Sequence, residues 1–221
     1  MKLHAHFRQV RSAALMLAMI AAVSACSSLD RSRALDNPRV GATTIAMQVC
    51  SNCHGLHGVS TSPNFPNLAA QPAAYLEAQL KAFKAHGRSD PAGFEYMWGL
   101  SARLSDEQIA GLSQYFSQQA AAVGRAGDPV REQRGKEIFM NGTAGGATPA
   151  CASCHGAKGE GMATFPRLAG QHADYVVKQL GVFQRTEGRP EGAIMKTVAH
   201  SLSSDDIANL AAYVQSIPPG G

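Results

Sequence analysis

The chain has 221 residues, enough for one large domain or two small ones. Its 45% hydrophobic and 16% charged residues exclude the disordered and collagen-like classes. The formal net charge of +4 falls to +1 without residues 1–25, because 17 basic residues then face 16 acidic ones. This balance gives no support for nucleic-acid binding.

Residues 1–25 have the pattern of a secretory signal peptide. Lys2, Arg8 and Arg11 precede an apolar run over residues 13–23, which small residues follow. The run is shorter than the roughly 20 residues that a membrane-spanning helix needs. We therefore predict export to the periplasm and removal of this segment.

Cys26 follows Val23-Ser24-Ala25, and the four residues resemble the lipobox of bacterial lipoproteins. Four of the five cysteines belong to the two motifs described next, so Cys26 is the one left over. We predict that Cys26 is lipidated and that residues 26–40 form a tether. The alternative is ordinary cleavage after Ala25, which leaves Cys26 as a plain thiol.

A five-residue motif occurs twice, 101 positions apart, as Cys50-Ser51-Asn52-Cys53-His54 and Cys151-Ala152-Ser153-Cys154-His155. C-x-x-C-H is the attachment signature of a c-type haem. The two thiols can form thioethers with the vinyl groups of one porphyrin, and the adjacent imidazole can reach the iron from the same side. The motifs predict two haem c groups, bound covalently by Cys50, Cys53, Cys151 and Cys154, with His54 and His155 as proximal iron ligands. The alternative is a pair of zinc-binding loops.

The remaining elements are predicted to be helical and to recur in both halves. In chain order, we expect helices over residues 43–49, after Pro72, from Ser105, over 131–140, through Val176, Leu180 and Phe183, and from Ser203. Ser105 with Gln108 fits a capping box, and Ser203 with Asp206 is a weaker copy. The glycine-rich stretch 141–149 is predicted to be a loop that is unique to the second half.

These patterns predict an all-α protein with two tandem helical domains, each built around one covalently bound haem. We place domain 1 at residues 41–121, a linker at 122–130 and domain 2 at 131–219. Each domain is small enough that its polypeptide core alone would be only marginally stable. The apolar faces of the porphyrin are expected to complete the core.

Met97 and Met195 are the predicted sixth ligands of the two irons. Each lies twelve residues before an isoleucine of the closing helix, Ile109 or Ile207, so the repeat selects both. Met162 follows His155 too closely to reach the opposite face of the ring. His86 and His200 are the competing candidates, although they do not occupy equivalent positions.

Two further groups of residues are expected near the haems. A backbone carbonyl near Pro66 or Pro166 is predicted to accept a hydrogen bond from the Nδ1–H of the proximal histidine; the alternative is that these prolines only stiffen a turn. Donors to buried propionates are expected among Tyr75, Tyr175, Gln79, Gln179, Arg88 and Arg189, although these could equally be helix-surface residues.

The chain resembles the dihaem cytochrome c4 family, which has two class I cytochrome c domains in tandem. The resemblance rests on CSNCHG and CASCHG, NFPNLAAQ and FPRLAGQ, the paired Tyr-x-x-x-Gln-Leu segments, and the methionines before LSDEQIAGLSQYF and LSSDDIANLAAYV. It covers nearly all of residues 41–217. It implies His/Met-ligated haems and periplasmic electron transfer towards terminal oxidases. The 141–149 insertion and Cys26 depart from the family pattern.

The leading hypothesis is a relay of single electrons between redox protein partners, without a small-molecule substrate or an enzymatic role. One alternative is the cytochrome subunit of a periplasmic dehydrogenase. A less favoured one is a dihaem peroxidase, in which one iron would lack its sixth protein ligand.

Overall fold

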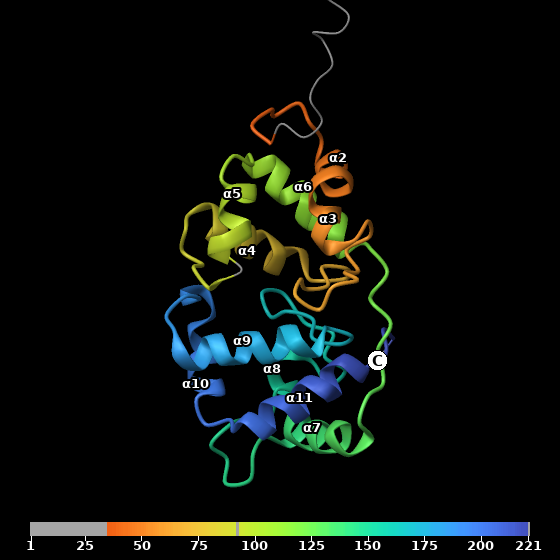
Figure 1. Cartoon of the computed structure of the whole chain (residues 1–221), viewed down its shortest axis with the longest axis vertical. Helices are drawn as coiled ribbons and strands as arrows, with labels where there is room; N and C mark the ends of the chain where they lie inside the picture. Colours follow the sequence, from red (N-terminus) through yellow and green to blue (C-terminus); the bar gives the residue numbers. More distant parts are fainter. Residues whose placement is uncertain (1–34, 92, 221) are drawn as a thin grey trace, which may run out of the picture.

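The computed structural model describes residues 35–91 and 93–220. The predicted signal peptide and Cys26 lie outside the described residues. Within them the regular elements are all helical, apart from one isolated bridge between Met162 and Phe165. The prediction of an all-α fold is thus confirmed. Figure 1 shows two halves stacked along the long axis of the molecule.

The first half runs from α2 to α6 and contains two π-helical turns, η1 and η2. Its elements are α2 (Ala42–Ile45), η1 (Ala46–Cys50), α3 (Ser51–His54), α4 (Ala73–Lys84), η2 (Gly93–Met97), α5 (Trp98–Ser101) and α6 (Asp106–Ser117). The first three form one continuous helical segment that ends at the first cysteine-histidine motif.

The second half runs from α7 to α11 and repeats this order. Its elements are α7 (Pro129–Asn141), α8 (Ala152–His155), α9 (Ala173–Arg185), η3 (Pro190–Gly192), α10 (Ala193–Ala199) and α11 (Ser204–Ser216). Here turns over residues 143–149 separate α7 from the second motif, as the composition of that stretch predicted.

Several helix ends follow directly from local chemistry. α4 begins after Pro72 as predicted, and complete capping boxes open α6 at Ser105 and α11 at Ser203. α7 begins two residues earlier than expected. Asp128 accepts a hydrogen bond from the N–H of Val130, and Pro129 occupies the first helical position, where no N–H is needed.

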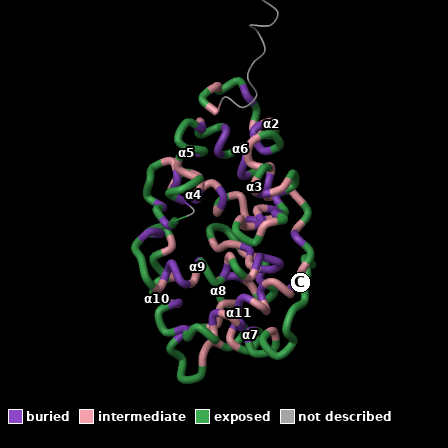
Figure 2. Tube along the Cα trace, viewed as in Figure 1, coloured by how far each residue is buried: buried purple, intermediate pink, exposed green. Residues whose placement is uncertain are grey.

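Each half has its own apolar core. In the first, Ile45, Ile109, Leu112 and Phe116 are almost fully buried. In the second, Phe139 packs with the α11 residues Leu210 and Val214. Figure 2 shows buried segments in both halves and again where the halves meet.

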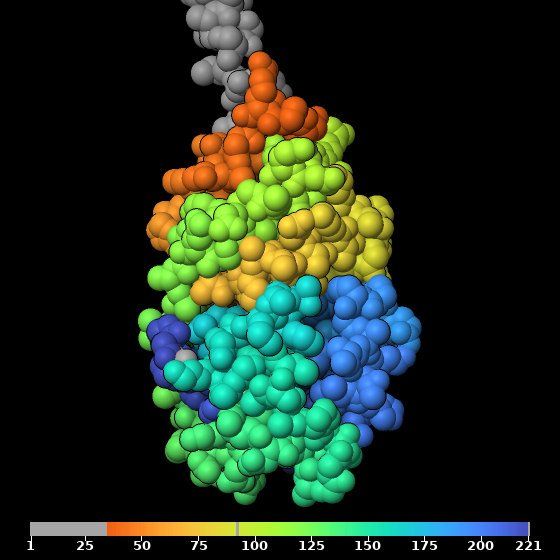
Figure 3. All heavy atoms as spheres, turned by 180° about the vertical axis from the view of Figure 1, so that it is seen from behind, coloured from red at the N-terminus to blue at the C-terminus, as the bar shows by residue number. Residues whose placement is uncertain are grey.

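The segment between α6 and α7 has no regular secondary structure and runs along the second half (Figure 1). The N–H of Arg125 donates to the carbonyl of Gln215 at 2.8 Å, which ties the segment to α11. Figure 3 shows the two halves in direct contact. Among the described helices, none is long and apolar enough to cross a membrane.

Candidate haem sites

Each cysteine-histidine motif ends a short helix whose histidine is buried. His54 closes α3 and His155 closes α8, with 8% and 6% of their surfaces exposed. A glycine follows each histidine, and its positive φ, 77° at Gly55 and 84° at Gly156, turns the chain away from the helix. The four motif cysteines are half-buried.

Both histidine rings are held in the same way. The Nδ1 of His54 lies 2.9 Å from the Pro66 carbonyl, and the Nδ1 of His155 lies 2.9 Å from the Pro166 carbonyl. A carbonyl can only accept, so Nδ1 carries the proton and Nε2 keeps its lone pair. The predicted carbonyl acceptors are confirmed, and both rings have the tautomer that can bind a metal through Nε2.

Burial keeps both imidazoles neutral. It lowers the pKa of His54 and of His155 below the ordinary 6.5, and this outweighs the opposite effect of the proline carbonyls.

Met97 and Met195 are half-buried and lie in corresponding segments. Met97 ends η2, and Met195 lies in α10, where it packs against the second core. Each segment has a glycine beneath a phenylalanine ring. A Cβ at Gly93 would lie 2.8 Å from Phe83, and one at Gly192 would lie 2.7 Å from Phe183.

The competing ligands occupy different surroundings. His86 is exposed and stacks on Trp98, with ring centroids 4.1 Å apart, and His200 is also exposed. Met162 is 65% exposed and pairs through its backbone with Phe165, the residue before Pro166. Met162 thus belongs to the loop that holds His155.

The donor set and the apolar lining fit a covalently bound porphyrin. Half-buried apolar residues pack against each core at equivalent positions: Leu68 and Leu168, Leu80 and Leu180, and the motif cysteines Cys50 and Cys151. In most closed cores such residues would be fully covered. Each half therefore has a partly uncovered apolar surface that includes a motif cysteine and that a flat apolar group would complete.

A buried polar cluster joins the halves through two arginines. Arg88 donates to Gln79 at 2.6 Å and to Gln179 at 3.4 Å. Arg189 donates to Gln179 at 2.7 Å and to Gln79 at 2.9 Å. Each guanidinium also lies over a phenylalanine of its own half, Arg88 over Phe83 and Arg189 over Phe183.

An acidic residue completes each side of this cluster, and the sequence reasoning did not identify either one. Asp90 accepts from the Nε of Arg88 at 2.7 Å and from Gln179 at 3.2 Å. Glu191 accepts from the Nε of Arg189 at 3.1 Å. The signal was available, because an acidic residue follows each arginine by two positions in both halves.

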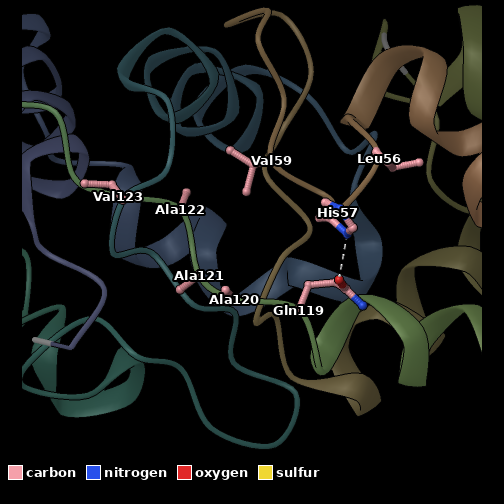
Figure 4. Close-up of a pocket in the computed structure, with 8 residues that line it drawn as sticks. All are labelled: Leu56, His57, Val59, Gln119, Ala120, Ala121, Ala122 and Val123. Atoms are coloured by element: carbon pink, nitrogen blue, oxygen red, sulfur yellow. Dashed lines mark hydrogen bonds between the residues drawn. The ribbon is translucent and has the colours of Figure 1, made fainter.

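An open apolar hollow of about 520 Å³ lies beside the first motif (Figure 4). Leu56, His57 and Val59 from the loop after His54 face residues 119–123 across it. The Nδ1 of His57 lies 3.2 Å from the Oε1 of Gln119 at its edge.

The family model described as cytochrome c matches twice, at residues 40–120 and 132–218. Cytochrome c4 of Azotobacter vinelandii is 39% identical over 178 residues, which cover 76% of this chain and 84% of that protein. The crystal structure of reduced recombinant cytochrome c4 from Pseudomonas stutzeri aligns with a TM-score of 0.72 at 37% identity, over 82% of this chain and 98% of that one.

A thiosulfate dehydrogenase from Marichromatium purpuratum also aligns, with a TM-score of 0.72 at 32% identity, over 81% of this chain and 40% of that one. The duplicated family match and the full-length cytochrome c4 relatives show that this chain carries two haem c groups and transfers electrons. The chain belongs to the dihaem cytochrome c4 family.

Proposed function

We propose that Cys50 and Cys53 hold one haem c and that Cys151 and Cys154 hold the other. His54 and Met97 are the axial ligands of the first iron, and His155 and Met195 are those of the second. The observation that carries this proposal is the pair of identical His–Pro hydrogen bonds, each of which leaves a buried, neutral Nε2 as the available ring nitrogen.

Each bound haem supplies one electron couple, ferric to ferrous iron. The protein holds both axial ligands in place, so that little rearrangement accompanies the change of charge. A neutral thioether favours the ferrous state and raises the reduction potential above that of a bis-histidine site. The guanidinium groups of Arg88 and Arg189 are buried between the halves and would serve as donors to carboxylates of the bound groups.

The function that these features support best is a relay of single electrons between respiratory protein partners, towards a terminal oxidase. Weak contacts suit such a carrier, because it must release each partner quickly. We propose that the chain has no catalytic role of its own. The test is a spectroelectrochemical titration of the matured protein under carbon monoxide. Two one-electron steps without carbon monoxide binding support the relay, whereas a carbon monoxide adduct in the unmodified protein favours the peroxidase alternative.

A second candidate is the cytochrome subunit of a dehydrogenase. It is favoured by the alignment with the Marichromatium purpuratum thiosulfate dehydrogenase, of which this chain covers 40%. Stopped-flow reduction by a thiosulfate dehydrogenase, compared with oxidation by a membrane oxidase, separates the two roles. Fast reduction together with slow oxidation by every oxidase tested would favour the dehydrogenase subunit.

We propose a periplasmic location, with lipid on Cys26 as the membrane attachment. The support is the basic, apolar and small-residue pattern of residues 1–25 and the lipobox-like stretch before Cys26. Mass spectrometry of the mature N-terminus and membrane fractionation of Cys26→Ser test this. An unmodified cysteine, or a membrane fraction that the substitution leaves unchanged, would remove the lipid anchor.

A further inference from the structure

Each peptide group that holds a proximal histidine is also bound by a glutamine of the other half. The N–H of Asn67 belongs to the same peptide group as the Pro66 carbonyl, and it donates to the Oε1 of Gln171 at 2.9 Å. In the second half, the N–H of Arg167 belongs to the peptide group of Pro166 and donates to the Oε1 of Gln71 at 2.9 Å. These contacts lie where the loop between α3 and α4 meets the loop between α8 and α9 (Figure 1).

Both the oxygen and the nitrogen of each glutamine amide are hydrogen-bonded. The Nε2 of Gln171 donates to the Asn67 carbonyl at 3.0 Å, and the Nε2 of Gln71 donates to the Arg167 carbonyl at 2.8 Å. Each glutamine therefore forms hydrogen bonds with both the N–H and the carbonyl of one residue across the interface. Both glutamines are 5% exposed, so water has little access to replace these bonds.

We propose that Gln171 of the second half sets the strength of the His54 hydrogen bond, and that Gln71 of the first half sets that of His155. An acceptor at the peptide N–H polarises the group and makes its carbonyl a better acceptor. The stronger Nδ1–H···O bond increases the basicity of the ring as a metal ligand and stabilises the ferric state. Gln71 and Gln171 are thus positioning residues whose effects cross between the halves. This inference rests on the proposed axial roles of His54 and His155.

The structure also indicates which glutamine has the larger effect on the histidine of the other half. The Oε1 of Gln171 accepts a second hydrogen bond, from the N–H of His172 at 3.0 Å. The residue after Gln71 is Pro72, which has no N–H to donate. Because one oxygen then serves two donors at Gln171, we expect the effect of Gln71 on His155 to exceed the effect of Gln171 on His54.

The test uses Gln71→Leu and Gln171→Leu in the matured two-haem protein. The first readout is the NMR resonance of each proximal Hδ1 in the reduced, diamagnetic state, and the second is the potential of each haem. Gln171→Leu should move the His54 resonance upfield and raise the potential of the first haem, while the second haem changes little. Gln71→Leu should move the His155 resonance upfield and raise the potential of the second haem, while the first haem changes little. Both of these shifts should be larger than those caused by Gln171→Leu.

His172→Phe is the matched control. The Nε2 of His172 bonds the Ser60 carbonyl at 3.0 Å, so this contact crosses the same interface without touching either peptide group. The control should leave both Hδ1 resonances in place. If a leucine variant does not mature, Gln71→Asn or Gln171→Asn replaces it, since the shorter amide cannot reach the peptide N–H.

A shift confined to the haem of the same half, equal shifts at both haems, or no shift at either would overturn the inference. These outcomes leave the proposed function intact, because the unmodified protein would still show two histidine-ligated haems. Absence of either haem-bound histidine from the unmodified protein would instead contradict the proposed function.

Discussion

The protonated nitrogen of His54 and that of His155 are each determined by one backbone carbonyl. Because Pro66 and Pro166 can only accept, His54 and His155 share one tautomer and one direction of approach to a metal. This feature was predictable, since proline follows each histidine at nearly the same distance, twelve residues in one half and eleven in the other. The roles of Asp90 and Glu191 were not recognised, although each follows its arginine by two positions, because carboxylates near arginines are usually solvated ion pairs.

The two methionines are tested by Met97→Ala and Met195→Ala. Each substitution should remove one ligand from one iron, so that one of the two haems binds carbon monoxide. The potential of that haem should fall, because a thioether no longer stabilises its ferrous state. Optical titration with carbon monoxide measures this. Met162→Ala is the control and should leave both irons closed. A variant whose low-spin spectrum matched the parent would show that the substituted methionine is not a ligand.

At the scale of elements, the second half depends on a close crossing of α7 and α11. A Cβ at Gly135 would lie 2.0 Å from the Asn209 carbonyl and 2.7 Å from the Cβ of Tyr213. Only a glycine allows the two backbones to approach this closely. In the first half the corresponding contact involves Gly111, where a Cβ would meet Ala42 at 2.7 Å.

We expect Gly135→Ala to destabilise the second half by about 2 kcal/mol, because α7 must move away from α11 and core contacts are lost. Chemical denaturation followed by circular dichroism gives the free energy of unfolding. Gly99→Ala in α5 is the control, since a Cβ there meets no atom within 4 Å and should be neutral or slightly stabilising. Equal stability of the Gly135 variant and the parent would argue against the tight crossing.

The sequence predicted where helices form better than it predicted the exact hydrogen-bond pattern within them. Apolar spacing and capping residues located α4, α6, α9 and α11, since those signals act within one helix. The π-helical turns η1 and η2 were not foreseen. One extra residue per turn hardly alters the apolar pattern, and its placement depends on tertiary packing.

At the scale of the molecule, the halves are joined through buried polar groups. The N–H of Ser89 donates to the Gly188 carbonyl at 2.7 Å beside the arginine cluster, and Gln71 and Gln171 cross between the proximal loops. The repeat made Gln71 and Gln171 visible in the sequence. Their pairing across an interface was not predictable, because identical positions could equally have faced solvent in two independent domains.

Asp90 provides a pH-dependent test of this interface. Burial alone would raise its pKa, but the hydrogen bond and charge of Arg88 lower it below the ordinary 3.8. Its contribution to stability is therefore complete above about pH 4 and is lost as the pH falls further, through the lowered pKa.

We expect Asp90→Asn to cost about 2 kcal/mol at pH 7, because the buried Arg88 loses its charged partner. The difference from the parent should be smaller at pH 2 than at pH 7, because Asp90 is then protonated in the unfolded state and part of its contribution to stability is lost. Denaturant unfolding at the two pH values measures it. Asp106→Asn is the control, because this exposed carboxylate lies 3.6 Å from Lys84 and should contribute little. A difference that did not depend on pH would contradict the ion pair.

The claim that two His/Met-ligated irons make this chain an electron carrier is tested most directly by near-infrared magnetic circular dichroism of the oxidised, matured protein. This measurement identifies the pair of axial ligands at each ferric iron. The predicted result is a low-spin histidine–methionine signal that accounts for two irons per chain. A bis-histidine signal, a persistent high-spin haem or a single iron per chain would contradict the account.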